Sequence, residues 1–188
     1  MEINSASLFK CVNVLRNNDI IAYPTESVFG LGCNPHNKNA IMKLLNLKKR
    51  IQSKGLILVA SHYNQVKSYI SERDLSFQNK SILLKTYLVP ITFLVPAKSC
   101  VPFWLTGKSK FLAIRISSHF FIKKLCNEFG TAIVSTSANY SGSKPCKTHA
   151  EVIKNFGKNI PIFHGKLGNS QNPSKIINLI SGELIRDS

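Results

Sequence analysis

Short hydrophobic runs alternate with amphipathic segments along the chain. The runs are rich in β-branched residues and are bounded by Gly, Pro or polar residues, which is typical of buried strands. The clearest is the continuous apolar run at residues 56–60, which predicts a central strand covered on both faces. The same pattern predicts strands at residues 20–23, 91–95, 111–116, 132–134, 160–163 and 175–180, with a return strand at 183–186.

The segments between these runs carry apolar residues at helical spacing. Ser5 is a candidate cap for a first helix that contains Leu8, Val12 and Leu15. Further helices are predicted at residues 39–49, 62–70, 74–85 and 119–128, and after the capping-box residues Thr148 and Glu151. This alternation, without a repeat or a linker, predicts a single α/β domain over residues 1–188. Its sheet should be twisted, mixed and open, and flanked by helices.

Two polar segments interrupt the hydrophobic pattern, and both are predicted to be loops. Residues 24–32 contain a Pro, two hydroxyls, a carboxylate and two glycines. Residues 135–142 follow the strand at 132–134 and supply several hydroxyls and an amide. At a strand end, such donors can hold phosphate or carboxylate oxygens. An ordinary polar turn that ends in Gly142 explains the second segment equally well.

The chain has a formal net charge of +16, from 25 Lys and Arg residues against 9 Asp and Glu residues. This excess suits a nucleic acid, a nucleotide or another polyanion as a partner. A codon bias toward Lys, Asn and Ile would also produce it, because the lysines are dispersed. Arg is rare, so the surviving arginines are candidates for sites that need a rigid bidentate donor. They are Arg16, Arg50, Arg73, Arg115 and Arg186.

Several classes of protein and site are disfavoured by what the sequence lacks. It has no P-loop, no dinucleotide-binding glycine pattern, no Ser–His–Asp arrangement and no paired carboxylates for a two-metal centre. The 5 cysteines form no C-x-x-C pair, which favours reduced thiols in a cytoplasm over structural zinc. No apolar run approaches the roughly 18 residues of a membrane span. Residues 1–4 do not resemble the start of a signal peptide.

Cations are concentrated after the predicted helix at residues 39–49. Lys48, Lys49, Arg50 and Lys54 all lie there. Positive charge at a helix C-terminus complements the helix dipole, at a few tenths of a kcal/mol for each residue. This effect accounts for one or two of these residues and less well for four.

Arg115 lies inside the apolar run at residues 111–116. A buried charge without a partner is very costly, so the guanidinium needs either a protein carboxylate or a ligand. The small number of acidic residues favours the ligand.

The remaining candidate residues are hydrogen-bond donors and cations. They are Thr25, Ser27, Lys48, Arg50, Lys54, Arg115, Ser135, Ser137, Asn139, Ser174 and Arg186. This set suits the binding of a polyphosphate and a carboxylate, with catalysis by positioning and charge stabilisation. A reaction whose nucleophile is already an anion needs no strong general base.

Four of these segments together resemble the YrdC-like threonylcarbamoyl-AMP synthases. They are residues 23–32 (Tyr-Pro-Thr-Glu-Ser-Val-Phe-Gly-Leu-Gly), Lys48-x-Arg50 with residues 54–58, residues 113–115 and residues 135–142. The segments occur in the family's order, and the resemblance extends from about residue 8 to residue 186. The length resembles that of the short, single-domain bacterial form, so the resemblance implies a YrdC-like fold.

The resemblance implies an enzyme that forms threonylcarbamoyl-adenylate and pyrophosphate from L-threonine, bicarbonate and ATP. This nucleotidyl transfer would supply the N6-threonylcarbamoyl group of adenosine 37 in tRNAs that read codons beginning with A. Mg²⁺ would arrive with the nucleotide, and no protein-bound metal is expected. tRNA and the proteins of the later transfer step are candidate partners. A cytoplasmic location without membrane contact is expected.

The resemblance also implies roles for individual residues. Threonine would be bound by Thr25, Ser27, Arg115, Ser135 and Ser174, with Arg115 pairing its carboxylate. ATP would be bound by Lys48, Arg50, Lys54, Ser137, Asn139 and Arg186. Lys48, Arg50, Ser137 and Asn139 would act in catalysis. The chain departs from the family pattern at residues 87–90, at Val59, where longer relatives have a nearby His, and at residues 174–176.

Two other classes of function fit parts of the sequence. A non-catalytic module that binds structured RNA or tRNA through its phosphates would show the same net charge. Such a module needs neither Arg115 inside an apolar strand nor the Ser/Asn segment. A nucleotide-binding regulatory subunit is a third alternative.

Overall fold

The computed structural model describes residues 4–85, 87 and 89–187 of the chain, so the expectations for residues 1–3 and for Leu88 lie outside it. Within this part, 8 strands form one sheet in the order β1-β2-β6-β3-β5-β4-β7-β8. Neighbours are antiparallel except for β3 with β5 and β4 with β7. The bounds are β1 Ile21–Pro24, β2 Phe29–Cys33, β3 Ile57–Ala60, β4 Ile91–Pro96, β5 Phe111–Ile116, β6 Ile133–Ser137, β7 Lys175–Asn178 and β8 Leu184–Arg186. The expected α/β fold with a mixed, open sheet is confirmed.

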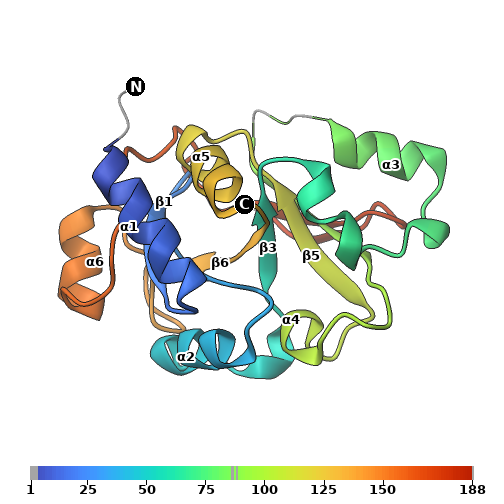
Figure 1. Cartoon of the computed structure of the whole chain (residues 1–188). Coiled ribbons are helices and arrows are strands. Elements are labelled where there is room, and N and C mark those ends of the chain that lie inside the picture. The colour runs from blue at the N-terminus through green and yellow to red at the C-terminus, as the bar shows by residue number, and fades with distance from the viewer. Residues whose placement is uncertain (1–3, 86, 88, 188) are drawn as a thin grey trace.

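Helices pack on both faces of this sheet. Figure 1 shows α1 (Ser5–Arg16) and α5 (Phe120–Phe129) side by side across one face. On the other face, α2 (Lys38–Lys48) packs against the larger hydrophobic core. The remaining helices are α3 (Phe77–Leu84), α4 (Phe103–Thr106) and α6 (His149–Phe156). None of the described helices is long and apolar enough to cross a membrane.

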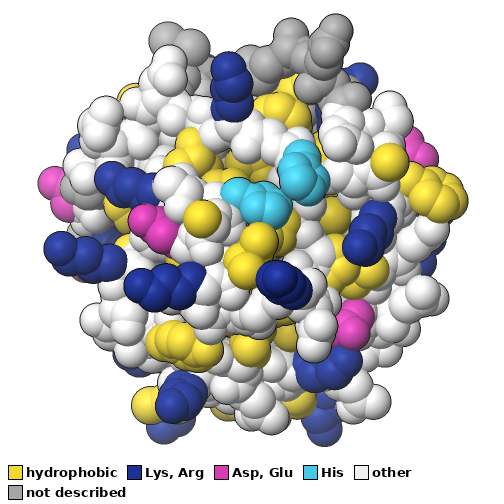
Figure 2. Space-filling model, turned by 90° about the vertical axis from the view of Figure 1, so that its left-hand side faces the viewer, with side chains coloured by type: hydrophobic (Ala, Val, Ile, Leu, Met, Phe, Trp, Pro, Cys, Tyr) yellow, Lys and Arg dark blue, Asp and Glu magenta, His cyan; other side chains and the backbone are white. Residues whose placement is uncertain are grey.

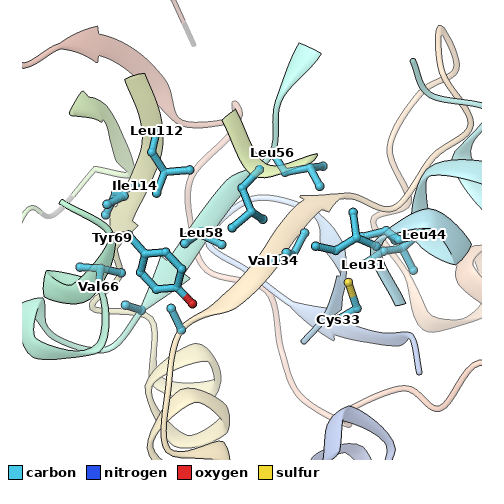
Figure 3. Packing of buried hydrophobic residues seen from close by; sticks show 14 of the residues in the cluster. Leu31, Cys33, Leu44, Leu56, Leu58, Val66, Tyr69, Leu112, Ile114 and Val134 are labelled. Carbon is cyan, nitrogen blue, oxygen red and sulfur yellow. The ribbon is translucent and has the colours of Figure 1, made fainter. Parts of the chain in front are cut away.

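Successive residues of the central strands point to opposite faces and so supply two cores. Tyr23, Val59 and Ile133 lie in the core beneath α1 and α5. Leu58 and Val134, the neighbours of the last two in sequence, lie in the larger core on the opposite face. Figure 3 shows part of this larger core, including Leu31, Leu44, Leu56, Leu112 and Ile114. Full burial of each such side chain contributes about 1.5–3 kcal/mol.

The helix predicted at residues 62–70 is wrong. The structure has two 3₁₀ turns there, Tyr63–Gln65 and Lys67–Tyr69. The side chain of Gln65 accepts hydrogen bonds from the N–H and the hydroxyl of Ser61, and donates one to a backbone carbonyl of α5. Such side-chain bonds to the backbone offer the segment an alternative to a continuous helix.

Two helix starts also differ from the prediction. α3 begins later than predicted, at Phe77, because Ser76 caps it and forms a capping box with Asn79. The first helix is capped by Asn4 and not by Ser5, and the Asn4 side chain accepts the hydrogen bond that fixes the first turn. The capping box of Thr148 is confirmed.

The prediction that residues 24–32 form one loop is wrong for its second half. Residues 29–33 form β2, which pairs with β1 as a hairpin. The two glycines that favoured a loop are needed for packing, because the Tyr23 ring lies against this strand. A Cβ at Gly32 would lie 2.9 Å from Cε1 of Tyr23 and 2.7 Å from the carbonyl oxygen of Val134. The glycines therefore mark a close approach within the sheet.

The strand predicted at residues 160–163 is reduced to a single bridge between Ile162 and Ala22. The N–H of Ala22 donates to the carbonyl of Pro161 at 2.9 Å, and the N–H of Phe163 donates to the carbonyl of Ala22 at 2.8 Å. Pro161 has no N–H of its own, which limits a longer ladder. The predicted C-terminal hairpin is confirmed as β7 and β8.

Replacing Gly32 tests the packing of the hairpin. Gly32→Ala should lower the free energy of unfolding by about 2–3 kcal/mol, because a backbone carbonyl blocks the new methyl group. Gly30→Ala is the matched control, because its Cβ would meet only side-chain atoms, at 3.2 Å or more. Its cost should be about 1 kcal/mol or less. Urea unfolding measures both, and equal losses would contradict this account.

Candidate active site

Strand ends and loops from both halves of the chain converge on one cavity of about 150 Å³. In the register of β2 and β6, Gly30 lies opposite Ser137, so the hairpin and the polar segment after β6 meet at this cavity. Most of the predicted donors line it. They are Thr25, Ser27, Arg50, Arg115, Ser135, Ser137, Ser174 and Arg186. The structure thus brings together residues that the sequence places far apart.

The alternation of the sheet explains how two of these residues reach the cavity. Arg115 of β5 is in register with Val59 of β3, and Ser135 follows two positions after Ile133. Val59 and Ile133 point into the core beneath α1 and α5. Arg115 and Ser135 therefore project to that same face of the sheet.

Arg115 is paired with a protein carboxylate, so the expectation that a ligand provides its counter-charge is wrong. Its Nη1 lies 3.2 Å from Oε2 of Glu26, and the two side chains are only 9% and 13% exposed. The guanidinium still lines the cavity, and its Nε has no hydrogen-bond partner among the described residues. One buried charge is thus compensated while the guanidinium remains part of the cavity wall.

Glu26 is held by a second donor. The hydroxyl of Ser117 donates to Oε1 of Glu26 at 2.6 Å and accepts the backbone N–H of His119 at 3.1 Å. Burial alone raises the pKa of Glu26, but Arg115 and Ser117 outweigh it and hold the pKa below its ordinary value. Glu26 was not among the site residues predicted from the sequence. The available signal was that Glu26 is the one acidic residue in segment 24–32.

Ser174 and Arg186 form a second hydrogen-bonded unit. Nη2 of Arg186 donates to the carbonyl oxygen of Ser174 at 2.6 Å and to its hydroxyl at 3.4 Å. The hydroxyl of Ser174 also shares a hydrogen bond of 2.7 Å with Oγ1 of Thr92 in β4. The β7–β8 hairpin therefore carries Arg186 to the cavity and ties it to the neighbouring strand.

Three guanidiniums line the cavity, those of Arg50, Arg115 and Arg186, and no carboxylate lines it among the described residues. Nη2 of Arg50 donates to the carbonyl of Gly55 at 3.1 Å. Burial lowers the pKa of Arg186, and the neighbouring charges of Arg115 and Arg50 lower it further. The cavity therefore carries an excess of positive charge and favours anionic ligands.

Lys48 supports the cavity and does not line it. Its side chain is buried, and Nζ donates to the carbonyl oxygens of Ser137 and Asn139 and, at 3.2 Å, to Oδ1 of Asn139. Burial and then the charge of Arg50 lower the pKa of Lys48 to about 8. These bonds fix the end of β6 and the segment after it. Stabilisation of the helix dipole alone would not require Lys48 to make them.

Asn139 has a similar supporting position. Its Oδ1 accepts the hydroxyl of Ser137 at 2.6 Å, and its amide donates to the carbonyls of Tyr140 and Ser143 at 2.9 and 2.7 Å. The Asn139 side chain thereby folds the segment, and Asn139 is not among the residues that line the cavity.

Two further candidates differ from the expectation in detail. The hydroxyl of Thr25 donates to the carbonyl of Val28 at 2.7 Å, so its proton closes the turn between β1 and β2. Lys54 is exposed and does not line the cavity. Thr25 therefore shapes the cavity wall, and Lys54 offers no donor inside it.

The arrangement is suited to binding and stabilising anions. Hydroxyls and guanidiniums can donate to carboxylate and phosphate oxygens and can stabilise charge that develops on a leaving group. In the part of the chain that the structure describes, no group of 3 or more His, Cys, Asp and Glu side chains could hold a metal ion. The donor set points to catalysis by positioning.

A family model with the description "Telomere recombination", Sua5_yciO_yrdC, matches residues 13–188. The chain belongs to this family. A protein from Buchnera aphidicola subsp. Baizongia pistaciae, named threonylcarbamoyl-AMP synthase, is 59% identical over 98% of this chain and 99% of its own. A protein of the same name from Klebsiella pneumoniae is 44% identical over 97% of this chain and 96% of its own.

Solved structures of the Sua5/YciO/YrdC family share the fold. P. abyssi Sua5 complexed with L-threonine superposes with a TM-score of 0.85 at 24% identity, over 95% of this chain. The chain spans about half of that longer protein, at 52% of its length. E. coli YciO superposes with a TM-score of 0.81 at 21% identity, over 98% of this chain and 90% of its own.

A double-mutant cycle tests the buried pair of Arg115 and Glu26. Arg115→Met and Glu26→Gln should each lower the free energy of unfolding by about 3–5 kcal/mol, because each leaves one buried charge unpaired. The double variant should lose less than the sum, since neither charge remains. Urea unfolding provides the values, and strictly additive losses would contradict the pair. Lys43→Met removes an exposed ion pair as a control and should cost at most about 1 kcal/mol.

The depressed pKa of Glu26 gives the sign of a pH effect. The contribution of its carboxylate to stability is complete above the unfolded pKa of about 4.3 and is lost as the pH falls through the lower folded pKa. The stability difference between the parent protein and Glu26→Gln should therefore be constant from about pH 6 to 8 and shrink in acid. Urea unfolding of both proteins from acid pH to about pH 8 measures this difference. A difference that grows in acid would refute the assignment.

Lys48→Met tests the support of the segment after β6. The variant should lower the free energy of unfolding by about 2–3 kcal/mol, because the carbonyl oxygens lose a charged donor. It should also speed hydrogen exchange at the N–H of Ser141, which donates to the carbonyl of Lys48 at 3.0 Å. Lys43→Met, on the exposed side of the same helix, is the matched control. Equal stability of the two variants would show that the Lys48 bonds contribute little.

Proposed function

We propose that this protein is a threonylcarbamoyl-AMP synthase. It joins L-threonine, bicarbonate and ATP to form threonylcarbamoyl-adenylate, pyrophosphate and water. The observation that carries this proposal is the cavity in which three guanidiniums and several hydroxyls converge without a lining carboxylate among the described residues. The relatives of this name, which match nearly the whole chain, support it.

At the threonine end of the site, the amino acid carboxylate binds to Arg115. The guanidinium lines the cavity and is held from behind by Glu26, so its direction is set before the ligand arrives. Ser27, Ser135 and Ser174 supply hydroxyls around the same position, and Thr25 shapes the turn beside them. A planar guanidinium that meets a carboxylate with two parallel bonds fixes the orientation as well as the affinity.

At the nucleotide end, Arg50, Arg186 and Ser137 contact the phosphates of ATP. Lys48 and Asn139 hold the segment that carries Ser137, and Lys54 is exposed outside the cavity lining. The amine of threonine and bicarbonate first form a carbamate, which is an anion. The carbamate oxygen attacks the α-phosphorus and the bond to the pyrophosphate oxygen breaks. Guanidiniums that face the departing pyrophosphate stabilise its charge.

Mg²⁺ enters with ATP as part of the substrate. The polar side chains that line the cavity are hydroxyls and guanidiniums, which do not suit a protein-held magnesium ion. The phosphate oxygens and water therefore provide its ligands. Magnesium then needs no carboxylate from the chain, and Glu26 remains paired with Arg115.

The product is a reactive mixed anhydride, and a later enzyme transfers its threonylcarbamoyl group to tRNA with release of AMP. The chain acts in the cytoplasm and supplies the N6-threonylcarbamoyl group of adenosine 37 in tRNAs that read codons beginning with A. Candidate partners are the proteins of that transfer step and tRNA itself. The net charge of +16 is compatible with such a polyanion.

Pyrophosphate release should require both threonine and bicarbonate, because the nucleophile is their carbamate. Purified protein is incubated with ATP, Mg²⁺, bicarbonate and labelled threonine, and pyrophosphate and labelled adenylate are measured. Pyrophosphate release without threonine would refute the mechanism. A protein that only binds RNA would release none under any condition.

Variants of the cavity arginines should separate chemistry from folding. Arg50→Ala and Arg186→Ala should each reduce kcat/KM by about 100-fold or more, because each removes a charge-assisted donor to the phosphates. Arg73→Ala is the matched control, because the Arg73 side chain is 88% exposed and does not line the cavity. An unchanged rate in both cavity variants would exclude this site.

A further inference from the structure

A second cavity, of about 210 Å³, shares no lining residue with the active-site cavity. It lies between α1, the start of α6 and the segment that follows α6. No carboxylate lines it among the described residues. Its polar lining residues are Asn4, Ser7, Lys10, His149, Lys158 and His164.

The framework around this cavity is fixed by hydrogen bonds. The N–H of His164 donates to the hydroxyl of Ser7 at 2.7 Å, and this hydroxyl donates to the carbonyl of Ile162 at 3.3 Å. The same segment is bonded to β1 on both sides of its bridge with Ala22. His164 is therefore held in place by α1 and by the sheet.

The second histidine comes from α6. His149 is its first residue, and its ring contacts that of His164, with centroids 4.6 Å apart and planes inclined by 36°. Nε2 of His149 is buried and has no hydrogen-bond partner among the described residues. Figure 2 shows histidine side chains next to each other on the α6 side of the molecule, with hydrophobic side chains beside them and Lys or Arg and Asp or Glu side chains farther out. A buried polar nitrogen without a partner is costly, so it indicates a place for a ligand.

The charged residues that line this cavity are all basic in the part of the chain that the structure describes. Lys10 lies on α1 and Lys158 follows α6. The carboxylate of α6, Glu151, does not line the cavity, because it accepts backbone N–H groups in the capping box. Burial and then the neighbouring His164 lower the pKa of His149. Among the described residues, no carboxylate of the cavity wall balances these basic groups.

We propose that this cavity binds a phosphate group between the two imidazole rings and the two lysines. Imidazolium and ammonium donors make short, charge-assisted bonds to phosphate oxygens, and here they come from three separate segments. A metal ion fits less well, because two imidazoles are an incomplete ligand set and the lysines repel a cation. A bound phosphate favours the protonated rings, so binding takes up protons and weakens when the rings are neutral.

The phosphate could belong to a small phosphorylated molecule or to a nucleic acid backbone, which offer the same chemistry. The proposal does not depend on the catalytic activity, because no residue of this cavity lines the active site. Variants of the two histidines should therefore leave pyrophosphate release unchanged. This separates a failure of the present proposal from a failure of the proposed function.

The test follows the ring protons of the full-length protein by NMR while inorganic phosphate is added. At about pH 6.5, phosphate should shift the signals of both rings and raise the pKa of His149, and at about pH 8.5 it should bind more weakly. His149→Gln and His164→Gln should each weaken binding by about tenfold. His62→Gln, at an exposed histidine outside the cavity, is the matched control. Sodium chloride at equal ionic strength controls for screening.

A second pair of variants protects the test against misfolding. Lys10→Gln and Lys158→Gln should also weaken phosphate binding, and a thermal melt confirms the fold of every variant. An RNA hairpin forms the second arm: shifts of the same ring signals identify a backbone phosphate, and their absence identifies a small phosphorylated molecule. The proposal is overturned if phosphate shifts neither ring at about pH 6.5, or if Zn²⁺ shifts both rings while phosphate does not.

Discussion

The ion pair between Arg115 and Glu26 joins two parts of the molecule that are not neighbours in the sheet. Glu26 lies in the turn of the β1–β2 hairpin, while Arg115 lies in β5, and β6 and β3 stand between them in the strand order. The same turn is attached to the following loop, because the carbonyl of Glu26 accepts the N–H of Ser170 at 3.0 Å. One buried pair therefore sets the position of a turn, a loop and a guanidinium of the cavity wall.

Lys48 likewise fixes the position of a segment that borders the cavity, the one that contains Ser137 and Asn139. Its ammonium ties the end of α2 to the carbonyls of the segment after β6, in place of a counter-charge. Buried charges of this kind are weak evidence for stability, because desolvation offsets much of what their bonds contribute. Their effect here is on geometry. Each charge admits few arrangements of the backbone around it, so the turn that carries Ser27 and the end of β6 that carries Ser137 have defined positions.

The sequence predicted most of the strands and the donor set of the cavity, because hydrophobic alternation and strand-end polar residues are local signals. It failed where a distant partner decided the structure. The glycines of β2 signal a loop locally, but the ring of Tyr23 explains them. Residues 62–70 have helical spacing, but the bonds of Gln65 divide the segment into turns. The pairing of Arg115 with Glu26 depends on two segments meeting in space. Glu26 is the one acidic residue of segment 24–32, but the sequence does not show that this segment lies beside Arg115.

Burial at the active-site cavity also explains why its cations are arginines and not lysines. The chain is rich in Lys, yet no lysine lines the active-site cavity among the described residues, and three of its five arginines do. Lys48 shows the difference, since burial and the charge of Arg50 bring its pKa to about 8, close to neutral pH. A lysine in the cavity wall would therefore lose part of its charge before the substrate arrived. A guanidinium starts from a much higher pKa than an ammonium and stays charged after a similar shift. A cavity that must hold several positive charges close together is for this reason built from arginine, with lysine placed behind it where carbonyl oxygens surround the ammonium.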